Sequence, residues 1–298
     1  MISPVRVLCC AALTVLTACG SRHPGSGQSA AGSAAVTQFT ASADGVQIAW
    51  RRVGQGDPAV VLIPGWAANS AIWRAQLAAL AAHYSVVTLD LAGQGASGAN
   101  RHTWTLPLFA QDVAAVVARL PNAHIVLVGD GLGGPVALEA APVIGARLTG
   151  IIGVETFRTL GLGPPPPAQV AHSLQFFHTN FAGAVRRFVS GTLFRPQSDP
   201  ALVHMVADMM AQATPDRALA TLAALNQLDY ASILPLVKAP ILVIDSDLGG
   251  AVDQARLQHA APRLRVITLS GDDSFPMLSD AQRFNATLLQ SIASLAAR

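Results

Sequence analysis

Cysteine is almost absent from this 298-residue sequence, and the three that occur are Cys9, Cys10 and Cys19. The chain beyond residue 19 therefore has no disulfide framework, no cysteine-bound zinc and no cysteine nucleophile. Charged residues are also scarce, at 12%, and a formal net charge of only +2 gives no reason to expect nucleic acid as a partner. Apolar residues make up 51%, which is typical of a compact protein with buried parallel strands.

The first residues have the features of a bacterial export signal. Arg6 supplies a positive charge, and residues 7–16 form an apolar run too short to span a bilayer. The letters LTAC at residues 16–19 resemble the lipobox of bacterial lipoproteins. This resemblance implies a signal peptide at residues 1–18, a lipidated Cys19 that anchors the protein to a membrane, and a flexible tether at 19–37. No aspartate follows Cys19, which favours the outer membrane, facing the periplasm; the alternative is an ordinary secretory signal.

From about residue 36, strand patterns and helix patterns alternate. Repeated β-α units of this kind predict an α/β fold with a mostly parallel central sheet and helices on both faces. The rhythm breaks after residue 156, where a proline run and further helical stretches predict an inserted helical cap at 157–236, between core parts at 38–156 and 237–298. Expected strands are 47–53, 59–63, 85–91, 124–128, 149–154, 241–244 and 266–269, and expected helices include 70–82, 106–120, 135–141, 181–189, 201–211, 253–259 and 281–296.

Residues 126–141, VLVGDGLGGPVALEAA, contain a glycine-rich turn that has two interpretations. Gly129, Gly131 and Gly134 spell G-x-G-x-x-G, the phosphate-binding turn of dinucleotide-binding proteins, and Glu155 has the spacing of a ribose ligand. That turn normally follows the first strand of its sheet, whereas several strands come earlier here. The other interpretation is a nucleophile elbow, G-x-S-x-G, with Gly131 at the serine position.

Four segments in order resemble the α/β-hydrolase superfamily, from about residue 47 to residue 295. They are VVLIPGWAANSAIW at 60–73, LDLAGQGAS at 89–97, the glycine turn itself, and GDDSFPML at 271–278. They match the family's oxyanion loop, its D-x-x-G-H-G-x-S turn, its elbow and the segment around its catalytic histidine. The sequence is therefore identified as a member of this superfamily.

The resemblance implies that the catalytic triad is degenerate. Gly131 stands at the serine position, and Ser274 stands at the histidine position. Asp247 is the best candidate for the acid, although the spacing also allows Gly249, and Glu155 is an alternative acid. A serine attacks only when a histidine takes its proton, so neither essential group is present in its usual place.

Other residues near the elbow offer weaker chemistry. Asp130 precedes the nucleophile position, so we expect it to point elsewhere and not to attack. Backbone N–H groups of Trp66 and Leu132 are expected to retain an oxyanion hole, partly offset by the charge of Asp130. The four histidines that could lie near the site mouth or in the cap are interpreted as surface or packing residues: His102, His172, His178 and His204.

These features predict a lipid-anchored pseudoenzyme that binds a small acyl or carbonyl ligand or a protein partner, without a cofactor or a metal. The alternative is an active, esterase-like hydrolase with a rearranged site. In that case Asp247 or Glu155, with His102 or a cap histidine, activates a water molecule beside the Leu132 amide.

Overall fold

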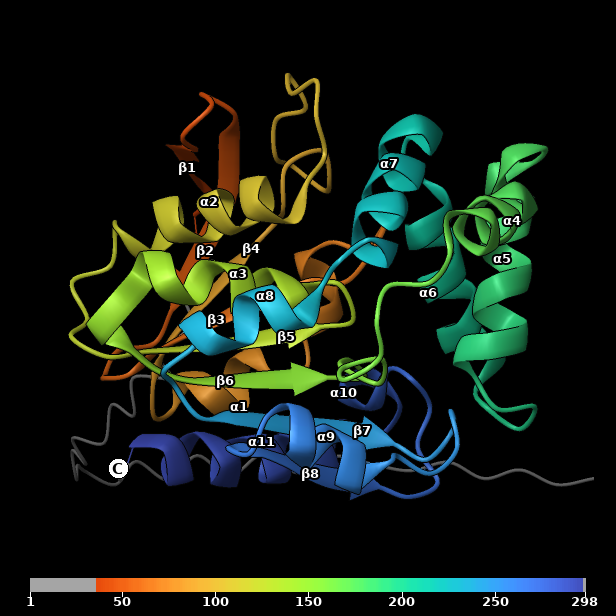
Figure 1. Cartoon of the computed structure of the whole chain (residues 1–298). Helices are drawn as coiled ribbons and strands as arrows, with labels where there is room; N and C mark the ends of the chain where they lie inside the picture. Colours follow the sequence, from red (N-terminus) through yellow and green to blue (C-terminus); the bar gives the residue numbers. More distant parts are fainter. Residues whose placement is uncertain (1–35, 297–298) are drawn as a thin grey trace, which may run out of the picture. The chain divides into compact units, whose positions relative to one another are not determined.

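A computed structural model describes residues 36–296, which build an eight-stranded sheet (Figure 1). The predicted signal peptide, the lipidation site Cys19 and all but the last two residues of the predicted tether lie outside the described residues. The strand order is β1-β2-β4-β3-β5-β6-β7-β8. The bounds are β1 Gln38–Ala41, β2 Gln47–Val53, β3 Ala59–Ile63, β4 Ser85–Leu89, β5 Ile125–Asp130, β6 Leu148–Val154, β7 Ile241–Ser246 and β8 Leu264–Leu269.

The sheet is mostly parallel. Strands β1 and β2 pair antiparallel at one edge, and β4, β3, β5, β6, β7 and β8 run parallel to one another. Every residue of β3 and β5 is buried, as continuous apolar strands covered on both faces require. The predicted α/β fold class is confirmed, and the carboxyl ends of the parallel strands meet at one edge of the sheet.

Helices cover both faces of the sheet (Figure 1). Helices α2 (Leu106–Val117) and α3 (Gly133–Ile144) pack together on one face, and α1 (Leu77–Ala81) and α11 (Ala281–Ala296) lie on the other. Helix α11 buries Phe284, Leu288, Ile292 and Leu295, spaced so that they share one side of the helix. This regular spacing predicted a helix at residues 281–296, and the structure confirms these bounds.

The helix expected at residues 70–82 is wrong as a single element. The chain forms a short 3₁₀ helix, η1 (Ser70–Trp73), and then the separate helix α1. Between them lies the buried Gln76, whose side-chain amide donates to the Met277 carbonyl at 2.7 Å. A tertiary hydrogen bond at this position, rather than local helix propensity, sets the backbone path.

Five helices lie between β6 and β7 in the sequence: α4 Pro167–His178, α5 Phe181–Phe188, α6 Pro200–Ala211, α7 Pro215–Asn226 and α8 Tyr230–Ile233. After β7 come α9 Gln254–Ala260 and α10 Pro276–Ser279. None of the helices in residues 36–296 is both long enough and apolar enough to cross a membrane.

Candidate active site

The chain makes a sharp turn from strand β5 into helix α3. Gly131 sits at this turn with φ +46°, a left-handed conformation, and Leu132 precedes the first residue of the helix. The Gly131 N–H donates to the Val154 carbonyl at 2.9 Å, and the Gly131 carbonyl accepts from the Thr156 hydroxyl at 2.8 Å. The geometry is that of a nucleophile elbow: a strained strand-to-helix turn at the carboxyl edge of the sheet. It follows the fifth strand in the chain, not the first.

The glycines of the elbow serve different purposes. A Cβ on Gly129 would collide with the backbone of Gly133 and Gly134, so helix and strand approach too closely for any side chain there. A Cβ on Gly131 would meet no atom within 4 Å. The turn at Gly131 therefore has open space where a side chain would begin.

Trp66, on the expected oxyanion loop, is buried under one aromatic residue of α4 and two of α5. Its ring contacts Phe177, Phe181 and Phe188, with centroid distances of 5.4, 6.2 and 6.5 Å. Its indole N–H donates to the Ala218 carbonyl of α7 at 2.8 Å. These contacts attach the inserted helices to the loop beside the elbow.

Little space remains on the other side of Trp66. A cavity of about 20 Å³ lies between this residue, the loop after β4 and helix α7. Trp104 and Arg217 narrow it, since the Arg217 guanidinium lies 5.9 Å from the centre of the Trp104 ring. Gln94, one of the positions where the family has histidine, donates to the Gly65 carbonyl at 3.3 Å.

Asp130 ends β5 directly before the elbow and is buried. Its carboxylate lies against Gly65, where any side chain would collide with it. Burial, followed by the nearby charge of Glu155, raises the pKa of Asp130 well above its usual range. A buried carboxyl with a raised pKa tends to stay protonated, which reduces the negative charge that we expected beside the Leu132 amide.

Two further carboxylates lie at this edge of the sheet. Glu155, with φ +48°, follows β6, and its carboxylate accepts the Ser246 N–H. Asp245 of β7 is fully buried, and burial together with the charge of Glu155 raises its pKa to about 7. The Arg158 guanidinium lies 3.9 Å from Glu155 and 3.6 Å from Asp245. We call Asp130, Glu155 and Asp245 the carboxyl cluster.

Sequence reasoning missed Asp245 and Arg158 as members of this site. Asp245 is a charged residue at the end of an otherwise apolar strand, which was a usable signal because the carboxyl ends of parallel strands meet. No sequence feature predicted that Arg158 belongs to this site, because the sequence does not show the direction of its long side chain. Its guanidinium fills the space in front of Gly249, 2.8 Å from where a Cβ would lie.

The other predicted triad positions lie on loops that Arg195 connects. Asp247 is exposed, pairs with the Arg195 guanidinium and accepts the Gly271 N–H at 2.9 Å. The Gly271 hydrogen bond and the charge of Arg195 lower the pKa of Asp247, so it is a weak base. Ser274 is half-buried, and its N–H donates to the Leu193 carbonyl at 3.0 Å. Sequence reasoning also missed Arg195.

The four histidines considered from the sequence, His102, His172, His178 and His204, are all exposed. Among residues 36–296, no group of three or more His, Cys, Asp or Glu side chains is arranged to hold a metal ion.

Comparisons with known proteins agree with this geometry. The chain is 27% identical over 254 residues to a pimeloyl-[acyl-carrier protein] methyl ester esterase from Xanthomonas oryzae, with 82% of this chain and 98% of the relative covered. The same enzyme from Xylella fastidiosa is 30% identical over 252 residues, covering 80% and 96%. An esterase from Exiguobacterium antarcticum has the same fold, with a TM-score of 0.77, 18% identity, and 87% and 100% coverage.

These relatives fit the predicted alternative, an esterase-like hydrolase, better than they fit a pseudoenzyme. The family model described as "Alpha/beta hydrolase family" matches residues 60–287, which include the elbow and the carboxyl cluster. The chain belongs to the alpha/beta hydrolase family.

Proposed function

We propose that this chain is an ester hydrolase whose site is rearranged around an elbow without a nucleophile. A water molecule takes the place of the missing serine hydroxyl and attacks the ester carbonyl directly. The observation that carries this proposal is the open space at Gly131, where no atom lies within 4 Å of a Cβ position.

The ester carbonyl is held by backbone groups. The N–H groups of Leu132 and Trp66 are the proposed oxyanion hole. Leu132 stands directly before helix α3, whose start adds partial positive charge. Neither group depends on side-chain chemistry, so the loss of serine and histidine leaves both in place. Burial raises the pKa of Asp130, which favours its neutral form beside the developing oxyanion.

Glu155 is the proposed base. It directly follows Val154 and precedes Thr156, the two residues that bind the backbone of Gly131. Its neighbour Asp245, with a pKa of about 7, can receive the proton near neutral pH. Water loses one proton to this carboxylate pair as its oxygen bonds to the carbonyl carbon. The tetrahedral intermediate then breaks its carbon–oxygen bond to the alcohol. The alcohol leaves with the proton that the carboxylate pair returns, the acid is the other product, and no acyl-enzyme forms.

A second candidate, binding of an ester or carbonyl ligand without turnover, is favoured by a different observation. Gly131 and Ser274 leave the elbow without a nucleophile and without its histidine. The two candidates share the binding site and differ in whether water attacks.

Hydrolysis of p-nitrophenyl butyrate by the wild type and by Glu155→Gln separates the two candidates. Glutamine keeps an oxygen that can accept the Ser246 N–H but cannot accept a proton, so we expect the rate to fall at least tenfold. The matched control is Asp247→Asn, which changes an exposed carboxylate outside the cluster and should keep most of the rate. Equal rates in the wild type and Glu155→Gln would exclude Glu155 as the base, and no rate above buffer would favour binding alone.

A further inference from the structure

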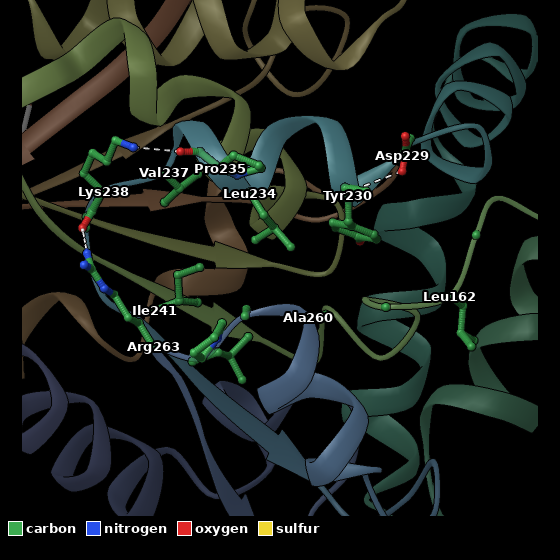
Figure 2. Close-up of a pocket in the computed structure, with 17 residues that line it drawn as sticks. Leu162, Asp229, Tyr230, Leu234, Pro235, Val237, Lys238, Ile241, Ala260 and Arg263 are labelled. Atoms are coloured by element: carbon green, nitrogen blue, oxygen red, sulfur yellow. Dashed lines mark hydrogen bonds between the residues drawn. The ribbon is translucent and has the colours of Figure 1, made fainter.

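A second cavity lies away from the elbow. It has a volume of about 600 Å³, within the range of small-molecule sites (Figure 2). Its walls come from three segments of the chain. The first is residues 161–163, after β6. The second runs from residue 229 through α8 to Ile241 at the start of β7, and the third from the end of α9 to the start of β8, residues 260–264. No part of the proposed ester site lines it.

The position of this cavity in the sheet separates it from the elbow. Ile241 begins β7 and Leu264 begins β8, and both line the cavity. The elbow follows the carboxyl end of β5, and β5 runs parallel to both strands. One part of the cavity therefore lies at the amino ends of β7 and β8, and none of the residues of the proposed ester site lines it, so its occupant would be distinct from the ester.

Positive charge gathers at one end of the cavity. Lys238, the single lysine of the chain, and Arg263 lie at the same end in Figure 2. Their positions are tied together, because the Arg263 guanidinium donates to the Lys238 carbonyl at 3.1 Å. The Lys238 ammonium donates to the Pro235 carbonyl at 2.9 Å, and both cationic side chains are exposed. This pair suits a single anionic group.

The rest of the cavity is apolar as far as its other end. Figure 2 shows Leu234, Val237 and Ile241 beyond the two cations, and Leu162 on the far side. Leu162 is 54% exposed, a large apolar side chain that borders the opening. Asp229 lies at the end opposite Lys238, where it would repel a second acidic group.

We propose that this cavity is a binding site for an aliphatic carboxylate, a single acidic group on an unbranched apolar chain. The carboxylate binds Lys238 and Arg263, and the chain lies along Leu234, Val237 and Ile241 toward Leu162. Charge at one end and apolar wall along the remaining length match the two parts of such a molecule. Burial of the chain supplies affinity, and the two cations fix its direction.

Equilibrium dialysis of the whole chain with radiolabelled decanoate tests the site. We expect one molecule bound per chain, with at least tenfold weaker binding in the double variant Lys238→Gln/Arg263→Gln. Decanol, which has the same chain without the charge, should bind the wild type and this variant equally. The matched control for charge is Arg119→Gln, at an exposed position after α2, and it should bind decanoate as the wild type does.

A second variant tests the location of binding. Ala231 is exposed and lines the cavity, so Ala231→Trp adds bulk over the opening without disturbing the core. Binding of decanoate and of decanol should both be lost, whereas Ala231→Ser should keep both. The proposal is overturned if decanoate does not bind, or if either the charge variant or Ala231→Trp binds it as tightly as the wild type. Esterase activity is not part of this test, so the two proposals stand or fall separately.

Discussion

At the scale of single residues, the elbow combines two kinds of glycine. Gly129 is required by packing, because backbone atoms of α3 occupy the space of a Cβ. Gly131 is favoured only by its backbone conformation, φ +46°, in which a residue with a Cβ is strained. The first glycine is fixed by contacts, whereas the second can be substituted.

Alanine substitutions measure this difference. Gly131→Ala should lower the free energy of unfolding by roughly 1–2 kcal/mol, the cost of the strained conformation alone. Gly129→Ala should cost more, because helix α3 must also move away from the sheet. Urea denaturation gives both values. Equal losses would show that the backbone at Gly129 relaxes, contrary to the packing seen here.

The carboxyl cluster makes stability depend on pH. The pKa of Asp245 is about 7 in the folded chain and near 3.8 when unfolded, so the folded state holds this proton more tightly. Its contribution to stability is present below pH 3.8 and is lost as the pH rises through 7. Asp245→Asn removes this dependence, and its advantage over the wild type should grow from pH 4 to pH 7, toward about 4 kcal/mol.

Thermal or urea unfolding from pH 4 to pH 8 measures the difference between the two chains. Asp216→Asn, at an exposed position on α7, is the matched control. A constant difference between the wild type and Asp245→Asn across this range would mean that Asp245 titrates at its ordinary pKa.

At the scale of elements, helix α2 is connected to the loops beside it by buried charge. Asp112 of α2 pairs with Arg101 at 2.6 Å, and Arg101 also pairs with Asp44 at 2.6 Å. The side chains of Arg101 and Asp112 are 1% and 0% exposed. Removal of one partner leaves an unpaired charge in the interior, which costs far more than the loss of a surface pair.

Asp112→Ala should therefore lower the free energy of unfolding by about 3–5 kcal/mol. Asp208→Ala, which breaks the exposed 2.8 Å pair with Arg186, should cost less than about 1 kcal/mol. Chemical denaturation of the two variants provides the comparison. Similar losses in both would show that Arg101 finds water or another partner once Asp112 is gone.

The sequence predicted elements best where their own pattern decides them. Helix α11 has a regular apolar side, and β2 and β3 have the predicted bounds. The helix expected at residues 70–82 failed because Gln76 is held by Met277, a residue 201 positions away. A contact between residues so far apart in the sequence cannot be predicted from the hydrophobic pattern of one segment.

At the scale of the whole described unit, family membership was predictable and the arrangement of the site only partly so. Motif letters around each expected catalytic position predicted the strand-to-helix turn at Gly131, which the structure shows. They did not show that Arg195 connects Asp247 to the loop before Ser274, or that Arg158 fills the space beside Gly249. Such contacts depend on how long side chains cross between loops that are distant in sequence.

The central claim is that a water molecule at Gly131 hydrolyses the ester. Alanine at this position puts a methyl group directly beside the place of that water and narrows the space open to it. Its small stability cost should leave the chain folded. The most direct measurement is the initial rate of p-nitrophenyl butyrate hydrolysis by the wild type and by Gly131→Ala, with folding verified by circular dichroism. This account predicts a wild-type rate above buffer that falls at least tenfold in the variant. A wild type no faster than buffer, or a variant as fast as the wild type, would contradict it.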